Sequence, residues 1–224
     1  MESNEKIQIL SDLIQFDSRN GNERPVAEYL KALFKKHGIE AEILPLASDP
    51  DHRANLVAHV GTGKPVIAFT GHMDVVDFDR SQWATDPLQL TMDGDKMFGR
   101  GVSDMKSGLA AAAIALIDIK EKEIPFDGTL RFLATAGEEV GMAGSTSLQA
   151  AGYMDDVDAL IVGEPTGYNT SFANKGELNI TLSAKGKAAH SSTPQLGINA
   201  IQELMDVWAD IKTKLDERSQ KDTN

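Results

Sequence analysis

The chain has 224 residues, a formal net charge of −12 and no cysteine. This length suits one ordinary domain, or one domain and part of another, and the absence of thiols excludes disulfides, thiolate metal sites and a cysteine nucleophile. An acidic chain repels phosphate backbones and anionic lipid surfaces, so the composition argues against nucleic-acid and membrane partners. The N-terminus lacks a signal-peptide core and no apolar run could span a bilayer, so we predict a cytoplasmic protein.

Two amphipathic helices are predicted at the start of the chain. Apolar residues recur at helical spacing over residues 7–14, and more strictly over residues 26–34. Pro25 lies at the expected start of the second helix and Gly38 lies just past its end, as the chemistry of helix termini favours.

Strands and helices then alternate up to about residue 163. This alternation predicts an α/β fold, with a sheet covered by helices on both faces. A long connection from residue 73 to about 103 interrupts it. We predict strands at 55–60, 65–70, 129–136 and 158–163, the last two buried, and helices at about 104–122 and 144–151.

The sequence changes character near residue 175. Residues 176–190 alternate as a half-exposed strand does, and apolar residues then mark one helix face from Ile201 to Leu215. A strand and a helix cannot close a core by themselves. We therefore divide the chain into residues 1–174, a catalytic or metal-binding portion, and residues 175–224, the beginning of a second domain.

Candidate metal ligands follow three of the predicted strands. His72 and Asp74 come after the first, Glu138 and Glu139 after the second, and Glu164 after the third. Ligands bind beyond the carboxyl ends of the strands in open α/β sheets, so these side chains are expected at one site. Any one of them alone would more simply be a solvated loop residue.

Asp104 is the fourth element of the predicted site. It stands at the expected start of a helix, where an aspartate can simply act as an N-cap. The two interpretations are compatible, because one carboxylate oxygen of a capping aspartate is free to bind a cation.

The ligand types suit zinc, with cobalt or manganese as substitutes, because imidazole nitrogen is combined with carboxylate oxygen. The charges of Asp104, Glu139 and Glu164 make a cluster of two divalent cations reasonable. The Asp74 carboxylate can accept the imidazole N–H of His72 and fix its tautomer. Of the paired glutamates, one can bind metal while the other acts as general base, and spacing does not decide which.

Five ordered motifs give the chain a family resemblance. It resembles the acetylornithine deacetylase, succinyl-diaminopimelate desuccinylase, aminoacylase and carboxypeptidase G family of dinuclear zinc amidohydrolases, and most closely the desuccinylases. The motifs are GHMDVV (71–76), GRGVSDMKSGLAA (99–111), AGEEVGMAGS (136–145), GEPT (163–166) and GKAAHSSTPQLGINAI (186–201).

The resemblance implies a fold and a set of partners. The fold is a zinc-peptidase-like mixed sheet flanked by helices, followed by the start of a small α+β lid domain through which two copies form a homodimer. The substrate is a small N-acyl amino acid or a short peptide. His190 matches a lid histidine that stabilises the oxyanion in the partner's active site, although without the flanking motif it would be an ordinary loop histidine.

The resemblance also implies roles for the candidate ligands. His72 and Glu164 would hold one zinc, Glu139 would hold the other and Asp104 would bridge both. Glu138 would be the general base, with Asp74 as the partner of His72.

One family feature has no counterpart in this sequence. The second zinc takes a further histidine from beyond the lid, and none of His37, His52 and His59 lies in a matching motif. We therefore expect the chain to be C-terminally incomplete and short of one ligand. Acetylornithine deacetylase, aminoacylase and dipeptidase activities stay open, as does a fragment that binds metal or dimerises without turnover.

Overall fold

The computed structural model of the chain describes residues 1–19, 21–167, 169–173, 176 and 178–221. The chain divides into two compact units, Met1–Thr170 and Ser171–Asn224, each of which is described by itself. The predicted domain boundary between residues 174 and 175 lies outside the described residues.

The first unit is built on a mixed sheet of five strands in the order β1-β2-β6-β3-β7. Strand β3 is parallel to both β6 and β7, whereas β2 is antiparallel to both β1 and β6. The carboxyl ends of β3, β6 and β7 therefore lie at the same end of the sheet. The strands are β1 Ala41–Pro45, β2 Ala54–Thr62, β3 Val66–His72, β6 Gly128–Thr135 and β7 Ala159–Val162.

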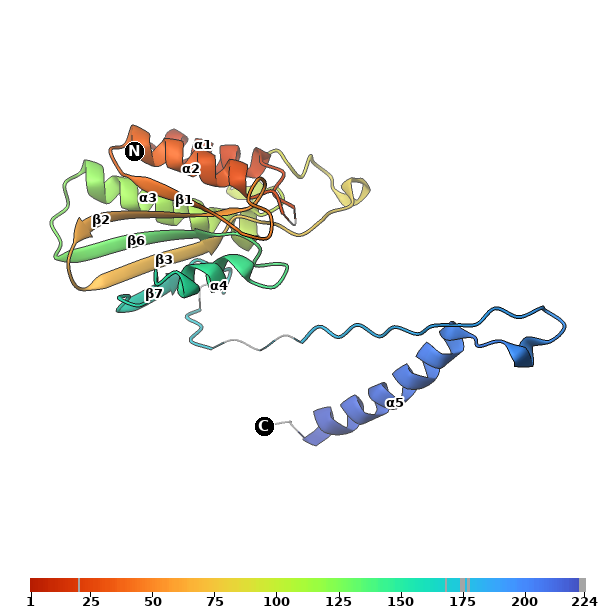
Figure 1. Cartoon of the computed structure of the whole chain (residues 1–224). Helices are drawn as coiled ribbons and strands as arrows, with labels where there is room; N and C mark the ends of the chain where they lie inside the picture. Colours follow the sequence, from red (N-terminus) through yellow and green to blue (C-terminus); the bar gives the residue numbers. More distant parts are fainter. Residues whose placement is uncertain (20, 168, 174–175, 177, 222–224) are drawn as a thin grey trace. The chain divides into compact units, whose positions relative to one another are not determined.

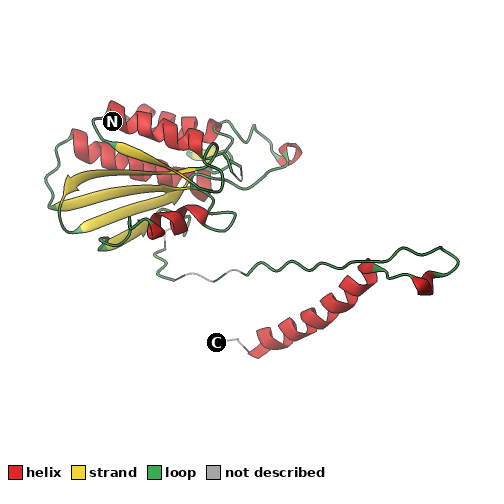
Figure 2. Cartoon of the chain, viewed as in Figure 1, coloured by secondary structure: helices red, strands yellow, loops and turns green. Residues whose placement is uncertain are grey.

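Helices lie on both faces of this sheet (Figures 1 and 2). Alternate residues of β2 show the two layers, because Leu56 and Ala58 belong to the large core beneath three helices, whereas Val57 belongs to a smaller cluster with Leu148. The predicted α/β class with a covered mixed sheet is thus confirmed. The three helices are α1 Ser3–Gln15, α2 Arg24–Lys36 and α3 Ser107–Glu121, and α4 Ala143–Ala150 covers the other face.

Several short elements were not predicted from the sequence. Strand β1 was not predicted, and the long connection after residue 73 contains the 3-10 turn η1 (Arg80–Gln82) and a hairpin of β4 (Thr91–Asp93) and β5 (Lys96–Phe98). Runs of three to five residues are too short for alternation to distinguish them from loop.

The prediction that residues 158–163 form a buried strand was correct for the strand and wrong for its burial. All four residues of β7 are exposed, and Ile161 retains 50% of its accessible surface. The reason is position: among the described residues β7 pairs only with β3, at the edge of the sheet. A strand is buried only when both faces and both edges have neighbours.

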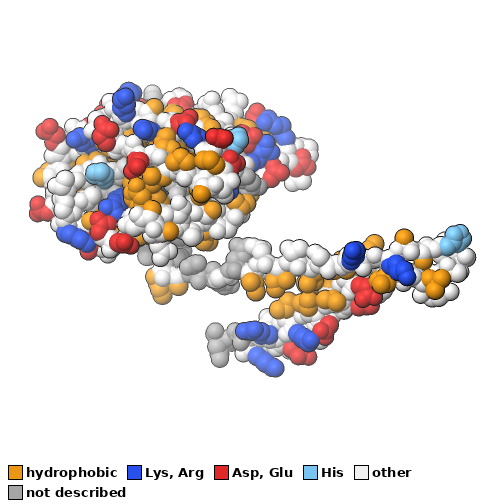
Figure 3. Space-filling view, in the orientation of Figure 1, with side chains coloured by type: hydrophobic (Ala, Val, Ile, Leu, Met, Phe, Trp, Pro, Cys, Tyr) orange, Lys and Arg blue, Asp and Glu red, His pale blue; other side chains and the backbone are white. Residues whose placement is uncertain are grey.

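The second unit contains a short turn, η3 (Pro194–Leu196), and the helix α5 (Ala200–Lys221). The predicted helix is confirmed, but the strand predicted at 176–190 is not formed in its described part, where a single bridge joins Lys187 to Ile198. A β-ladder needs a neighbouring strand to accept its hydrogen bonds, and the described residues supply none. Figure 3 shows apolar side chains gathered on this unit. The exposed large apolar residues of α5 include Ile201, Met205, Trp208 and Leu215.

In the described part of the chain, no helix combines the length and the apolar character needed to cross a bilayer.

Candidate metal centre

The sheet topology brings the predicted ligands to one end of the sheet, where the parallel strands finish. His72 is the last residue of β3 and pairs in register with Thr135, the last residue of β6, so that the loop carrying Glu138 and Glu139 starts beside it. Strand β7 runs parallel to β3 and ends two residues before Glu164. Parallel strands thus deliver an imidazole and three carboxylates to the same end of the sheet, as predicted.

Among the residues that the structure describes, two groups of side chains could each hold a metal ion, and His72 belongs to both. One group is His72, Asp104 and Glu164, and the other is His72, Glu138 and Glu139; within each, one ligand atom per residue lies within 4.8 Å of the others. The Nε2 atom of His72 lies 3.0 Å from Asp104 Oδ1 and 3.5 Å from Glu164 Oε1. The second group leaves open which glutamate would bind a metal.

Asp104 faces His72 and does not cap a helix. It lies in the irregular turn η2 (Val102–Lys106), where Asp104 and Met105 have non-helical backbone angles. Helix α3 begins only at Ser107 and has no side-chain cap. The N-cap interpretation was therefore wrong, because the backbone turns before the helix starts and leaves the carboxylate directed at the imidazole.

Asp74 makes different contacts from those predicted. The Nδ1 atom of His72 lies 2.9 Å from the main-chain carbonyl oxygen of Asp74, whereas the carboxylate oxygen Oδ1 of Asp74 is 3.7 Å away. The tautomer of His72 is thus set by a main-chain acceptor. The carboxylate, which is fully buried, instead accepts hydrogen bonds from the backbone of residues 137–139.

The site concentrates negative charge. Burial is the largest cause that raises the pKa of Glu164 to about 7, and the neighbouring carboxylate of Asp104 adds to it against the opposing effect of His72. Burial, followed by Asp104, likewise raises the pKa of Glu139. Burial lowers the pKa of His72, but the carboxylates of Asp74 and Glu164 outweigh it and the net shift is upward. Carboxyl pKa values raised in this way mark a place where a divalent cation would relieve repulsion.

A family model described as Peptidase family M20/M25/M40 matches residues 68–220, more than half of the chain. The chain belongs to this family. The matched region contains every residue of both candidate ligand groups and His190.

Two curated relatives align with this chain over most of its length. A probable succinyl-diaminopimelate desuccinylase from Staphylococcus aureus (strain MRSA252) is 47% identical over 220 residues, which cover 98% of this chain and 53% of that protein. An acetylornithine deacetylase from Pasteurella multocida (strain Pm70) is 35% identical over 208 residues, covering 92% of this chain and 52% of that protein. The chain thus spans about half the length of the curated relatives it matches.

A solved structure shares the fold. The M20 family metallo-carboxypeptidase Sso-CP2 from Sulfolobus solfataricus matches 73% of this chain and 37% of its own, with a TM-score of 0.63 and 21% sequence identity. The likeness places the sheet and helices of the first unit in the M20 fold.

Two residues that sequence reasoning missed follow Asp104 in the turn η2, next to the candidate metal centre. The buried thioether of Met105 accepts the main-chain N–H of His72 at 3.2 Å. Lys106 is fully buried, and its ammonium donates to the carbonyl oxygens of Leu13 and Phe16, both at 2.9 Å. Burial lowers the pKa of Lys106 to about 8. A lysine in a polar-looking motif gives no sequence signal that it is buried.

The remaining histidines lie outside the two ligand groups. His37 contacts Glu121 at 2.7 Å and His52 contacts Asp49 at 2.9 Å, whereas His59 is exposed on β2. In the second unit, exposed His190 contacts the hydroxyl of Ser192 at 2.8 Å.

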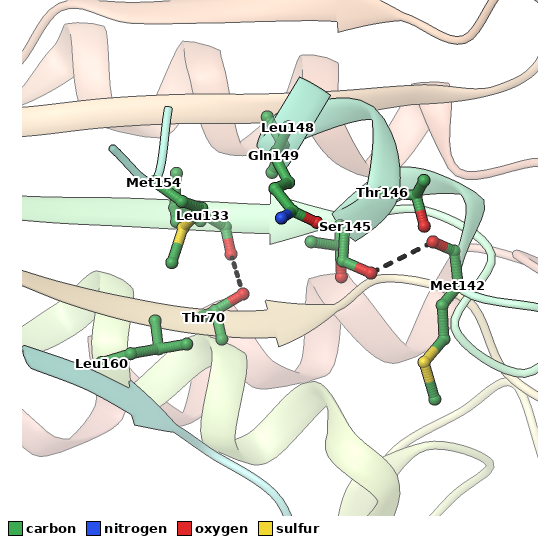
Figure 4. Close-up of a pocket in the computed structure, with 10 residues that line it drawn as sticks. Thr70, Leu133, Met142, Ser145, Thr146, Leu148, Gln149, Met154 and Leu160 are labelled. Atoms are coloured by element: carbon green, nitrogen blue, oxygen red, sulfur yellow. Dashed lines mark hydrogen bonds between the residues drawn. The ribbon is translucent and has the colours of Figure 1, made fainter. Parts of the chain in front are cut away.

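A cavity of about 380 Å³ opens beside α4 and contains none of the predicted site residues (Figure 4). Leu133, Met154 and Leu160 form much of its apolar lining, while Ser145 turns its hydroxyl to the carbonyl oxygen of Met142 at 3.1 Å. Its lining side chains are apolar or neutral and polar, and none of them is a candidate metal ligand.

Proposed function

We propose that the protein hydrolyses the amide bond of an N-acyl amino acid with the help of bound zinc. The observation that carries this proposal is the convergence of one imidazole and three carboxylates at the ends of parallel strands with a fourth carboxylate, that of Asp104, from the turn η2. The 47% identity to a probable succinyl-diaminopimelate desuccinylase favours an N-succinyl substrate over the N-acetyl substrate suggested by the more distant acetylornithine deacetylase. Aminoacylase and dipeptidase activities are alternatives within the same family.

The donor set supports a cluster of two zinc ions. In this proposal His72 and Glu164 would hold one ion and Glu139 would hold the other, and Asp104 would be shared between them. Cobalt or manganese would fit the same oxygen and nitrogen donors. When bound, the ions would polarise the scissile carbonyl and lower the pKa of the attacking water.

Glu138 is the proposed general base. It is half-buried beside His72 and Glu139, so its carboxylate is close to the cluster without being shut off from solvent. A carboxylate in this position takes the proton of the attacking water and later delivers it to the leaving nitrogen. Exchanging the roles of Glu138 and Glu139 is the alternative that the second ligand group leaves open.

The assembly stays a prediction. A homodimer formed through the second unit, with His190 stabilising the oxyanion in the partner's site, follows from the family resemblance and from the exposed apolar face of α5. The cytoplasmic location is likewise a prediction from sequence.

A metal-binding chain without turnover is the second candidate function. It is favoured by one observation: both ligand groups among the described residues depend on the same imidazole, His72. A catalytic zinc usually has about three protein ligands and a water, so a second cation sharing this set would be weakly held.

Calorimetric zinc titration and hydrolysis assays separate the two candidates. The assays use N-succinyl-diaminopimelate, N-acetylornithine and a dipeptide, each offered to this chain and to a polypeptide extended to the relatives' length. We expect one zinc site and little turnover in this chain, and two sites with desuccinylation in the extended protein. Failure of the extended protein to hydrolyse any N-acyl substrate would refute the proposed function.

A further inference from the structure

The carboxylate of Asp74 accepts three consecutive main-chain hydrogen bonds. Its Oδ1 atom receives the N–H groups of Gly137 at 3.0 Å and Glu138 at 3.2 Å, and its Oδ2 atom receives that of Glu139 at 3.1 Å. Successive N–H groups directed at one point form an anion-binding nest. Here the anion is a side chain of the same protein, and the nest carries both glutamates of the site.

The same residue holds His72 by a different atom. The imidazole Nδ1 contacts the main-chain carbonyl oxygen of Asp74 at 2.9 Å. Asp74 therefore joins the two halves of the site, with its carbonyl on the histidine and its carboxylate on the loop of residues 137–139, which we call the glutamate loop.

We propose that Asp74 is a positioning residue for the glutamate loop, and that its main chain, not its carboxylate, orients His72. The importance of this arrangement for hydrolysis rests on the proposed function. The positioning itself is independent of that function and can be tested without any substrate.

Neighbouring groups keep the buried carboxylate in place. Arg53 packs against Gly137, and its guanidinium forms hydrogen bonds with the fully buried Glu23 at 2.8 and 3.1 Å. The bond to Glu23 chiefly raises the pKa of Arg53, and attraction to Asp74 contributes. A buried carboxylate persists only with such hydrogen bonds and charges around it.

The chain before and after the glutamate loop is held independently of Asp74. The side chain of Asn55 accepts the N–H of Ala136 and donates to the carbonyl oxygen of Gly144, each at 3.0 Å. Because Asn55 fixes the chain at Ala136 and at Gly144, loss of the Asp74 carboxylate should loosen residues 137–139 and leave the rest of the fold intact.

The variant Asp74→Asn tests the assignment, because it keeps the shape and the main-chain carbonyl but replaces one acceptor oxygen with a donor. We expect amide hydrogen exchange of residues 137–139 to accelerate about tenfold or more, while exchange in β3 and β6 stays unchanged. The ¹⁵N signals of the His72 imidazole should keep their positions. Asp77→Asn is the matched control, since Asp77 is exposed and contacts Arg19 instead.

A second measurement needs no variant and keeps the test independent of folding. In the ¹⁵N,¹³C-labelled chain, couplings across hydrogen bonds should connect the amides of Gly137, Glu138 and Glu139 to the side-chain carboxyl carbon of Asp74. Absence of these couplings, or a His72 signal that moves in Asp74→Asn while the loop exchanges normally, would overturn the assignment. Because neither readout involves hydrolysis, such a result is distinguishable from failure of the proposed function.

Discussion

His72 contacts several other residues of the candidate site. Its Nε2 atom faces Asp104 and Glu164, its Nδ1 atom faces the carbonyl of Asp74, and its own N–H contacts the sulfur of Met105. The ring is buried, so its orientation is set by these partners and not by solvent. A substitution here removes the nitrogen donor from both ligand groups at once.

We predict that His72→Gln abolishes tight zinc binding. Changes in residues that merely support a metal ligand cost about 10–100-fold in affinity, so loss of the shared ligand should cost at least as much. Calorimetric titration measures the change, and His52→Gln is the control because His52 lies in an exposed turn. Equal affinity in wild type and His72→Gln would place the metal elsewhere.

Glu138→Gln should separate metal binding from catalysis in the extended protein. As a general base, Glu138 is expected to contribute on the order of 10²–10⁴-fold to kcat. Zinc stoichiometry, measured beside kcat, should stay at the wild-type value. Loss of zinc in this variant would instead make Glu138 a ligand, and undiminished kcat would remove it from the mechanism.

At the scale of elements, two glycines set how closely α3 approaches the strand ends. A Cβ atom on Gly108, in the first turn of α3, would lie 3.0 Å from the carbonyl carbon and 3.2 Å from the Cα atom of Gly163. Gly163 directly precedes Glu164, so this contact also sets the position of a candidate ligand. Met105 packs against the same glycine.

Gly108→Ala should therefore destabilise the first unit. Helix propensity alone predicts a gain of up to about 1 kcal/mol for this change, whereas overpacking against backbone costs about 1–3 kcal/mol. We expect the second effect to win, with a net loss measurable by urea unfolding. Gly176→Ala is the control, because a Cβ atom there meets nothing within 4 Å. A stabilised Gly108→Ala variant would show that the helix can shift.

Strand β7 is an element with an exposed edge. Its sequence is entirely apolar and its residues Leu160, Ile161 and Val162 are each 44–51% exposed. Such an edge strand, without proline or charge, can pair with another chain.

We predict that this chain self-associates with rising concentration and that Ile161→Lys weakens the association by about tenfold or more, because a charge on an edge strand opposes pairing. Sedimentation equilibrium gives the association constants. The control is Met92→Lys, which changes a similarly exposed apolar residue of the β4–β5 hairpin. An equal effect of both variants would mean that β7 is not the contact surface.

At the scale of the whole first unit, ion pairs join the start of the chain to α3. The carboxylate of Asp118 lies 2.9 Å from the amino group of Met1, 2.8 Å from Lys6 and 3.3 Å from Lys122. Hydrogen bonds from Lys6, followed by those from Met1 and Lys122, hold the pKa of Asp118 well below its usual range. A carboxyl whose folded pKa is depressed stabilises the fold above its unfolded pKa, and that contribution is lost as the pH falls towards the folded value.

Asp118→Asn should consequently lower the free energy of unfolding at neutral pH by about 1 kcal/mol, the scale of a small network of partly exposed ion pairs. The difference from wild type should shrink as the pH falls below about 4, where the carboxyl becomes protonated in the unfolded chain. Urea unfolding across this range, with exposed Asp127→Asn as the control, gives the measurement. A constant difference at all pH values would mean that the ion pairs contribute nothing.

The sequence by itself determined the fold class, most of the long elements and which residues belong to the candidate site. Periodicity identified α1 and α2, and the residues after each predicted strand identified His72, Glu138, Glu139 and Glu164, because a parallel sheet collects such residues at one edge. These inferences need only local patterns and the general geometry of α/β sheets. The roles of the individual residues stay predictions.

Only the tertiary structure decided the contacts on which those roles depend. Sequence spacing cannot tell a main-chain carbonyl from a carboxylate as the partner of His72, nor show that the carboxylate of Asp74 binds a loop more than sixty residues away. It also could not show that Lys106 is buried or that β7 is exposed. Hydrogen-bond partners and burial depend on which segments, far apart in the sequence, pack against one another. The local sequence pattern does not contain this information.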